Sequence, residues 1–290
     1  MKKISETELV LNPDGSVYHL KLRPEHISDT ILVVGDQGRV ETVSRHFTNI
    51  ECRIQNREFV THTGYYNGKK LTVLSTGIGT DNIDIVVNEL DALVNIDLVK
   101  RTINEKFISL NIVRLGTSGA LQGDIPVDNF VMSEYGLGFD GLLNFYRTDK
   151  NIYEVEMAEA FIHHMKWSTN LARPYIVKGS EMLMKKLGDG LFKGITATAS
   201  GFYGPQGRQL RIEPLDPEMN DKMQEFNFKG NRITNFEMET SALYGLGAIL
   251  GHNTLTICSI IANRVIKQFS KDYKKGVETM IQMVLDRITV

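Results

Sequence analysis

Short apolar runs rich in valine, isoleucine and leucine recur along the chain, and most of them end in glycine or in a polar turn. Three of these runs, TILVVG at 30–35, LTVLSTGIG at 71–79 and LTICSIIAN at 255–263, have the length and the β-branched content of buried strands. Two further runs of the same character occupy 107–121 and 128–135. The pattern therefore predicts that these segments are the strands of a sheet.

Segments with helical spacing of apolar residues follow several of the runs. The segments 36–47 and 80–94 come directly after predicted strands. The segment 152–167 is also predicted to be an amphipathic helix. Its apolar side is expected to comprise Ile152, Val155, Ala158, Ile162 and Met165. The last predicted helix has an apolar stripe formed by Val277, Met280, Ile281, Val284 and Ile288.

Strands that alternate with helices predict an α/β fold, with a central, mostly parallel or mixed twisted sheet flanked by helices. No tract rich in proline, glycine and serine divides the chain, and no internal repeat is present. We therefore expect a single domain over residues 16–290, with residues 1–15 as a polar N-terminal extension. Ligands of such sheets bind beyond the carboxyl ends of the strands, so the turns that follow the strands are the first candidates for a site.

The composition limits the partners of this domain. The chain has 33 Lys and Arg residues against 35 Asp and Glu residues, a formal net charge of −2, so no global basic field attracts nucleic acid or an anionic membrane. Cys52 and Cys258 are too few for a disulfide scaffold and suit a reducing compartment. The N-terminus lacks the apolar core of a signal peptide. We therefore expect a cytoplasmic protein. We expect no metal site, because His46, His62 and His252 have no cysteine or carboxylate at the spacing of metal ligands.

Two of the strand ends carry an arginine. In VVGDQGRV, Gly35 ends a strand, Asp36 can cap the next helix, and Arg39 lies one turn into that helix. In VRLGTSGAL, Arg114 lies inside an apolar strand and Thr117 is expected in a glycine-bounded turn. A guanidinium beside neutral turn donors suits a phosphate group. The alternatives are a capped turn with a solvated Arg39, and an Arg114 that pairs with a carboxylate for structural reasons.

The loop TASGFYGPQGRQ contains Phe202, Gln206 and Arg208. A glutamine amide matches O2 and N3–H of uracil at once, and an arginine can donate to O4. Cytosine reverses the pattern at N3 and C4 and would be rejected by the same pair. Phe202 can stack on a base or a ribose. The alternative interpretation is that these are the ordinary polar residues of a surface loop.

Two glutamates, Glu237 and Glu239, stand just before the apolar helical run in NFEMETSALYGLGAIL. On a helix, residues two apart point in different directions, so the pair is not expected to share a face. One interpretation is that they cap the helix, where carboxylates favour the macrodipole. The other is that one carboxylate enters a pocket and accepts hydrogen bonds from the hydroxyls of a substrate.

Taken together, these blocks resemble the nucleoside phosphorylases that share the α/β fold of purine nucleoside phosphorylase, and most closely the uridine phosphorylases. The similarity extends from about residue 17 to the C-terminus. The matching blocks are GDQGRV, REF, STGIG, RLGTSGAL, FYGPQGRQ, NFEMETSAL and IIANR. Several blocks in the family's order are far more specific than any one of them.

The resemblance implies a role for each matching residue. The residues implied to bind phosphate are Gly35, Arg39, Arg57, Arg114 and Thr117. Those implied to bind the base are Phe202, Gln206 and Arg208, and those implied to contact ribose are His19, Glu237, Met238 and Glu239. Glu239 is the expected acceptor for the ribose hydroxyls, with Glu237 secondary. Catalysis is expected to rest on Arg39, Arg114 and Arg208.

The resemblance also implies an activity and an assembly. The expected reaction is the reversible phosphorolysis of uridine to uracil and ribose 1-phosphate, with inorganic phosphate as co-substrate and no cofactor. His19 and Arg57 are implied to serve the neighbouring subunit's site, so we expect a homo-oligomer with a dimer as its smallest active unit, or a hexamer. The alternatives are a purine nucleoside phosphorylase, a nucleoside hydrolase of the same fold, and an inactive nucleoside-binding module.

Two positions bear on a monovalent cation. Some relatives bind potassium between subunits, close to the glutamate of the REF block and to a serine. The glutamate of that block is Glu58 here. Asn82 stands where that serine is usual. The substitution argues against an ion in this protein.

Overall fold

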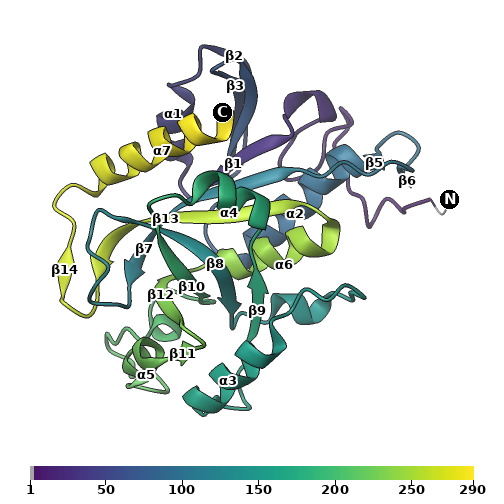
Figure 1. The fold of residues 1–290 in the computed structure, drawn as a ribbon. Helices are drawn as coiled ribbons and strands as arrows, with labels where there is room; N and C mark the ends of the chain where they lie inside the picture. The colour runs from purple at the N-terminus through teal and green to yellow at the C-terminus, as the bar shows by residue number, and fades with distance from the viewer. Residues whose placement is uncertain (1–2) are drawn as a thin grey trace.

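The apolar runs form the middle of a large mixed sheet in the computed structural model, which describes residues 3–290 (Figure 1). The strands are β1 (Thr30–Val34), β2 (Asn49–Asn56), β3 (Phe59–Tyr66), β4 (Lys69–Ser75), β5 (Ile96–Asp97), β6 (Thr102–Ile103), β7 (Asn111–Ala120), β8 (Phe130–Gly138), β9 (Tyr175–Lys178), β10 (Phe192–Thr198), β11 (Asn227–Phe228), β12 (Asn231–Glu237), β13 (Asn253–Asn263) and β14 (Gln268–Phe269). Each of the predicted strand segments is confirmed.

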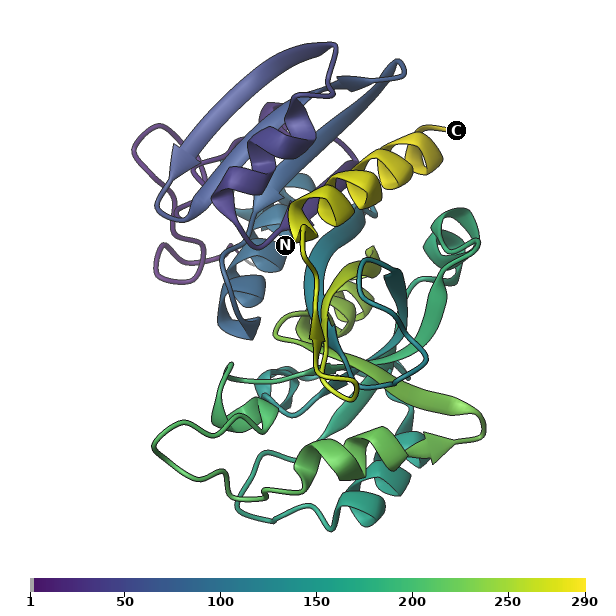
Figure 2. The ribbon, with the colours of Figure 1, turned by 90° about the vertical axis from the view of Figure 1, so that its left-hand side faces the viewer.

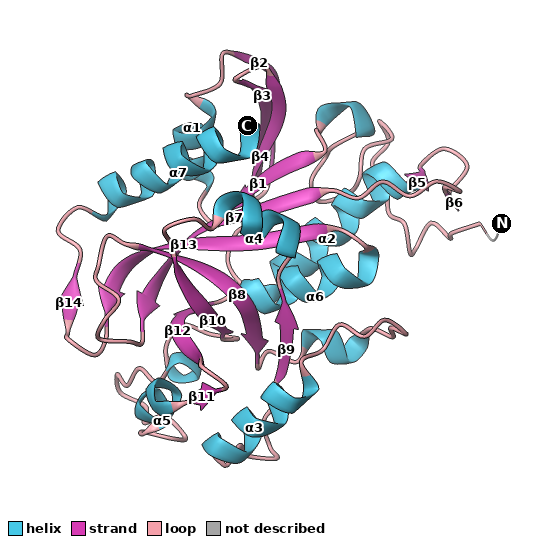
Figure 3. Cartoon of the chain, viewed as in Figure 1, coloured by secondary structure: helices cyan, strands magenta, loops and turns pink. Residues whose placement is uncertain are grey.

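Helices pack on the sheet from more than one side (Figure 3). The α-helices are α1 (Gln37–Ser44), α2 (Thr80–Asn95), α3 (Val155–Met165), α4 (Glu181–Leu187), α5 (Met219–Glu225), α6 (Thr240–Leu250) and α7 (Tyr273–Thr289). Short 3₁₀ helices are η1 (Pro24–His26), η2 (Leu142–Phe145) and η3 (Gly204–Gln206). None of the helices between residues 3 and 290 is long and apolar enough to cross a membrane.

The strand pairing is mixed, and part of the sheet closes on itself. Among residues 3–290, the main strand order is β11-β12-β10-β8-β13-β7-β1-β4-β3-β2. Strand β1 is parallel to both β4 and β7, and β7 is parallel to β13. Strand β12 pairs with β10 and also, antiparallel, with β7, so β12, β10, β8, β13 and β7 form a closed ring. The predicted α/β fold with a mixed sheet is confirmed.

Two apolar layers lie on the two faces of the central strands. In β1, Ile31 and Val33 belong to a core with α2 and α6, whereas Leu32 and Val34 belong to a core with α1 and α7. Successive side chains of a strand point to opposite faces, so a strand covered on both faces is apolar throughout. Helix α7, the yellow helix in Figure 2, runs beside α1. All five residues of its predicted stripe are buried.

The structure corrects three details of the sequence analysis. The buried residues of α3 are Met157, Ala158, Phe161 and Met165, whereas Val155, the first residue of the helix, is 59% exposed. Ala158 and Met165 belong to both sets, so packing against α5 and β9 buries a stripe that is shifted toward Met157 and Phe161. Thr117 lies within β7 and not in a turn, because β7 continues its pairing with β13 through Ala120. Glu237 and Glu239 precede α6, at the end of β12 and at the helix cap respectively.

Near the N-terminus, the chain packs along the domain. Leu9 is buried, and the Ile4 amide donates to the carbonyl of Arg101 at 2.8 Å. The division of the chain at residue 15 stays a prediction.

Candidate active site

The carboxyl ends of β1, β4, β7, β12 and β13 surround one cavity of about 800 Å³. This is where an α/β sheet is expected to bind its ligand. The predicted site residues that line it are Gly35, Arg39, Arg114, Thr117, Phe202, Gln206, Arg208, Glu237, Met238 and Glu239. Segments separated by more than a hundred residues of sequence therefore meet at this cavity, and only Arg57 and His19 of the predicted set lie outside its lining.

Two guanidinium groups lie close to one another in the cavity lining. Asp36 caps α1 by accepting a hydrogen bond from the Gly38 amide, which places Arg39 in the first turn of the helix. The Arg39 guanidinium donates to the carbonyl of Leu115 in β7 at 3.1 Å. Burial, together with the nearby charge of Arg114, lowers the pKa of Arg39 from its usual value. Guanidinium groups bind the oxygens of a phosphate through their N–H donors, so this pair is a candidate phosphate site.

Arg114 is buried and pairs with both glutamates. Its Nη2 donates to Glu239, and its Nη1 lies 3.3 Å from a carboxylate oxygen of Glu237. Burial disfavours the charge of Arg114, but the two carboxylates outweigh this effect and raise its pKa. Its Nε is buried without a hydrogen-bond partner in the described part of the chain. The pairing with carboxylates that was considered as an alternative is therefore present, and Arg114 also lines the cavity.

Gly116 makes room for this guanidinium. A Cβ at position 116 would lie 2.1 Å from Nη1 of Arg114 and 2.9 Å from the Cys258 sulfur. Such distances are shorter than van der Waals contact, so any side chain here would push the guanidinium away. The glycine of the RLGTSG block thus determines where Arg114 sits.

Glu237 joins the arginine to the start of α6. Its carboxylate accepts from the amides of Glu239 and Thr240 at 3.0 Å and from the Thr198 hydroxyl at 2.7 Å. These bonds satisfy amides at the helix N-terminus, as the capping interpretation predicts. Burial raises the pKa of Glu237 to about 7, although Arg114 acts in the opposite direction.

Glu239 links the sheet ends to one another. One carboxylate oxygen accepts from the Gly79 amide at 2.8 Å, at the N-terminal cap of α2, and the other binds Arg114. Gly79 has a φ of 99°, a backbone conformation that glycine adopts without strain. The two glutamates, expected on different sides of a helix, in fact converge on one arginine because neither belongs to the helix.

The loop around η3 contributes a second part of the cavity lining. Gln206 is buried, and its side-chain oxygen accepts from Arg208 at 2.6 Å and from Arg264 at 2.8 Å. The Arg208 guanidinium lies over the Phe202 ring, 3.7 Å from its centroid. Burial lowers the pKa of Arg264 to about 10. Arg264 was not among the predicted site residues, although it belongs to the IIANR block and could have been found there.

His19 and Arg57 are placed away from the cavity lining. The Glu89 carboxylate accepts from His19 Nδ1 at 2.6 Å and from the backbone amides of His19 and Leu20. Arg57 lies over the Tyr18 ring, 5.3 Å from its centroid. Both residues are held near the surface of the chain, and the roles predicted for them at the site of a neighbouring subunit stay predictions.

No group of three or more His, Cys, Asp or Glu side chains within residues 3–290 is arranged to hold a metal ion. Glu58 and Asn82 both line the cavity, near Gly77. A Cβ at Gly77 would lie 2.3 Å from the Asn82 side-chain nitrogen, so the amide packs directly on this turn. The expectation about a monovalent cation stays a prediction.

Comparison with known proteins identifies the family. The model of the phosphorylase superfamily matches residues 29–289, and the chain belongs to this superfamily. A uridine phosphorylase from Thermococcus kodakarensis is 28% identical over 281 residues, which are 95% of this chain and 87% of that protein. A DeoD-type purine nucleoside phosphorylase from Buchnera aphidicola is 24% identical over 276 residues, 94% of this chain and 99% of that protein.

A solved structure agrees with these relatives. A Trypanosoma brucei nucleoside phosphorylase described as showing uridine phosphorylase activity superimposes with a TM-score of 0.84 and 27% identity, covering 97% of this chain and all of that one. The predicted nucleoside phosphorylase family is thereby confirmed. The relatives include both uridine and purine nucleoside phosphorylases, so the family match covers both base specificities.

Proposed function

We propose that this protein catalyses the reversible phosphorolysis of uridine, with inorganic phosphate as co-substrate and no other cofactor. The observation that carries the proposal is the polarity of the cavity. Arg39 and Arg114 are held at Leu115 and Gly116 of β7, with Glu239 bound to Arg114. Arg264, which together with Arg208 binds Gln206, packs at Gly119, further along the same strand. An anion, a polyhydroxyl sugar and a uracil ring fit these groups in that order.

The amide of Gln206 supports a pyrimidine. Its oxygen has two lone pairs, which Arg208 and Arg264 occupy in the absence of substrate, so its NH₂ group remains to donate. We infer that uracil takes O2 to the amide NH₂ and N3–H to the amide oxygen. Arg208 then exchanges the amide oxygen for O4 of the base, while Arg264 keeps Gln206 in place.

The polar groups suit a reaction in which charge separates. Phosphate held by Arg39 and Arg114 attacks C1′ while the glycosidic bond breaks, so the sugar becomes cationic and the uracil anionic. The phosphate charge stabilises the sugar, and Arg208 stabilises the departing base. Hydrogen bonds that strengthen as this charge develops favour the transition state over bound substrate. Glu239 accepts from the ribose hydroxyls with the lone pairs that Arg114, Gly79 and the Met238 amide leave free.

The purine alternative is disfavoured by the end of β13. The family's purine branch commonly has an aspartate in this region, whereas the segment ICSIIANR (257–264) has none. The Asn263 side chain is buried and used by the fold, since its nitrogen donates to the carbonyls of Gln122 and Ile125 at 2.8 Å. Its oxygen accepts from the amides of Val265 and Ile266. No group of this side chain is left for a purine.

Phosphate dependence tests the reaction class. Uridine, inosine and thymidine are each incubated with the protein, with and without phosphate, and the released base is quantified after chromatography. We expect uracil only when phosphate is present, together with ribose 1-phosphate in equal amount. Equal release without phosphate would identify a hydrolase, faster release of hypoxanthine would identify a purine enzyme, and binding without release would identify an inactive module.

The proposed site is completed by a second subunit, and mixed dimers test this. Homodimers of His19→Ala and homodimers of Arg114→Ala are both expected to be inactive. If His19 acts across the interface, each chain supplies Arg114 to its own site and His19 to the site of its partner. In a mixed dimer, one of the two sites receives both substitutions and the other receives neither. Random reassembly should therefore restore about one quarter of wild-type activity, since a dimer of this kind is isologous. No recovery in verified mixed dimers, or a fully active monomer, would show that each subunit builds its own site.

A further inference from the structure

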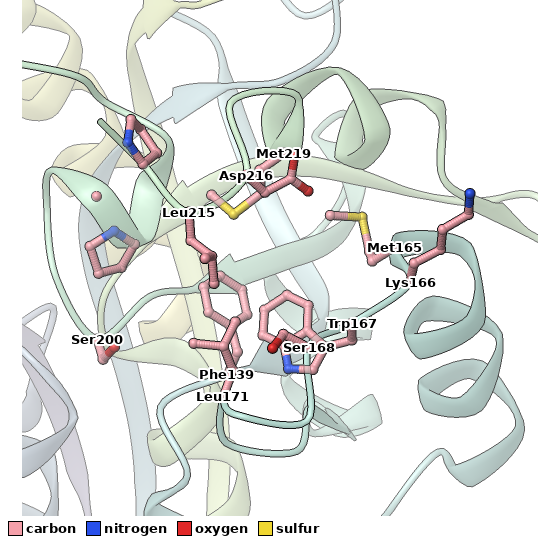
Figure 4. A pocket seen from close by; sticks show the side chains of 13 residues that line it. Phe139, Met165, Lys166, Trp167, Ser168, Leu171, Ser200, Leu215, Asp216 and Met219 are labelled. Carbon is pink, nitrogen blue, oxygen red and sulfur yellow. The ribbon is translucent and has the colours of Figure 1, made fainter. Parts of the chain in front are cut away.

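A second cavity lies on the other side of the loop that builds the base-binding end of the site. It has a volume of about 450 Å³, a size typical of small-molecule sites. Its walls come from the end of α3 and the turn after it, from the loop before α5, and from the 200–205 part of the η3 loop (Figure 4). None of its lining residues takes part in the proposed reaction.

The lining is mainly apolar, with aromatic and sulfur-containing side chains. Its cationic residue, Lys166, extends its side chain away from the other labelled residues (Figure 4). Phe139 and Trp167 lie with their ring centroids 5.4 Å apart, and Met165 and Met219 also face the cavity (Figure 4). Aromatic edges and thioethers both attract the face of an aromatic ring. The one carboxylate in the lining, Asp216, is neutralised by Lys222 at 2.9 Å.

Two other polar groups of the lining already have hydrogen-bond partners within the protein. The Trp167 indole N–H already donates to the carbonyl of Ala172 at 3.0 Å. The Ser168 hydroxyl accepts from the Asn170 amide at 3.3 Å and can still donate to one acceptor on a ligand. A flat aromatic molecule with at most one or two polar atoms would therefore leave the Trp167, Ser168 and Asp216 side chains satisfied.

One short segment separates this cavity from the active site. Gly204 and Pro205 line the second cavity, whereas Gln206, the next residue in the same 3₁₀ helix, lines the active site. Phe202 and Arg208 of the same loop also face the active site. A ligand packed on Pro205 would therefore act directly on the turn that holds the base-recognising amide.

We propose that the second cavity binds an uncharged, flat aromatic molecule, and that its occupancy increases the affinity of the active site for the nucleoside. The ligand adds contacts to the loop in the conformation that directs Gln206 and Arg208 into the active site. Because it binds this conformation better than any other, it shifts the loop population toward it. By linkage, nucleoside must increase the affinity for the aromatic ligand by the same factor. This coupling to uridine rests on the proposed function.

The only tryptophan of the chain gives a direct readout, since Trp167 lines the cavity. The probe is 4-nitrobenzyl alcohol, a flat neutral molecule whose nitro group quenches indole fluorescence on contact. We expect saturable quenching of Trp167 in the wild-type protein, beyond the linear quenching by acrylamide. At saturating probe, KM for uridine should fall by about fivefold, the lower end of typical allosteric couplings, and KM for phosphate should not change.

Two pairs of variants locate the effect. Ser168→Phe fills the cavity with a ring, whereas Ser168→Ala removes the same hydroxyl without filling it. Leu171→Arg places a charge at a lining position that is 44% exposed and tolerant of polar side chains, with Leu171→Met as its control. Far-ultraviolet circular dichroism and thermal melting establish that each variant is folded. We expect Ser168→Phe and Leu171→Arg to abolish saturable quenching and the change in KM, and both controls to retain them.

The outcomes separate the two parts of the proposal. Quenching that stays linear up to the solubility limit of the probe would overturn the site. Saturable quenching that is lost when uridine is added would mean that the probe occupies the active site, and would also overturn it. Saturable quenching with an unchanged KM would overturn the coupling. Fluorescence needs no turnover, so failure of the uridine assay alone would count against the proposed function and leave the binding result standing.

Discussion

Replacing Glu237 by glutamine tests how burial of this carboxyl affects the stability of the protein. The side chain is enclosed beneath the start of α6, where it accepts from backbone amides and faces Arg114 at 3.3 Å. Burial raises its pKa from the usual 4.5 to about 7, the Arg114 charge opposes the rise, and the Glu239 charge reinforces it. Glutamine has nearly the same shape but does not titrate.

The sign of the effect follows from proton binding. Between pH 4.5 and about 7 the folded protein holds a proton on Glu237 that the unfolded chain has released. The free energy of unfolding therefore falls as the pH rises through this interval, and the contribution is lost above it. At about 1.4 kcal/mol for each pKa unit, the loss is on the order of 3 kcal/mol.

Urea unfolding at pH 5, 6, 7 and 8 measures this slope at one fixed protein concentration. We expect the wild-type free energy of unfolding to decline relative to that of Glu237→Gln by on the order of 2–3 kcal/mol between pH 5 and 8. Glu181→Gln, which removes an exposed carboxylate paired with Lys178, is the control and should keep the wild-type slope. Identical slopes in wild type and Glu237→Gln would refute the reasoning.

Three further substitutions test the site. Arg208→Ala removes the guanidinium over Phe202 and should cost uridine turnover about 2–4 kcal/mol of transition-state stabilisation, measured as kcat/KM, with phosphate affinity nearly unchanged. Glu89→Gln weakens the carboxylate that orients His19 Nδ1 and should raise KM for uridine about tenfold, the size of one charge-assisted hydrogen bond, without changing KM for phosphate. Gly116→Ala should displace Arg114 and lower kcat/KM for phosphate about 100-fold.

Matched variants serve as controls for these measurements. Arg211→Ala removes an exposed arginine close to Arg208 in the chain and should leave kcat/KM for uridine unchanged. Gly119→Ala places a methyl group at ordinary contact distance, 3.4 Å from Arg264, and should lower activity far less than Gly116→Ala. Loss of uridine turnover in Arg211→Ala as large as in Arg208→Ala would contradict the assignment of Arg208 to the base. An unchanged KM for uridine in Glu89→Gln would contradict the role of His19.

Much of the fold could be predicted from local patterns. Strands such as β1 and β13 are apolar throughout because helices cover both faces of the sheet, and this leaves a continuous run in the sequence. The cap by Asp36 was predicted because a cap depends only on neighbouring residues. Strand β2 was missed because it alternates between exposed and half-buried residues, with no apolar run to mark it. Strand β12 was missed although most of its residues are buried.

By itself, the sequence determined the fold class and the strand ends that meet at the site, because these depend on the local spacing of apolar and polar residues. It also determined the family, because blocks of residues match the family's blocks in the same order. Only the tertiary structure decided how the polar groups pair. Arg114 meets two glutamates more than 120 residues away, and Arg264 meets Gln206 across 58 residues. These partners are brought together by the closure of β12 onto β7 and by the turn of the η3 loop. Pairings of this kind depend on strand register and packing, which no local pattern of residues specifies.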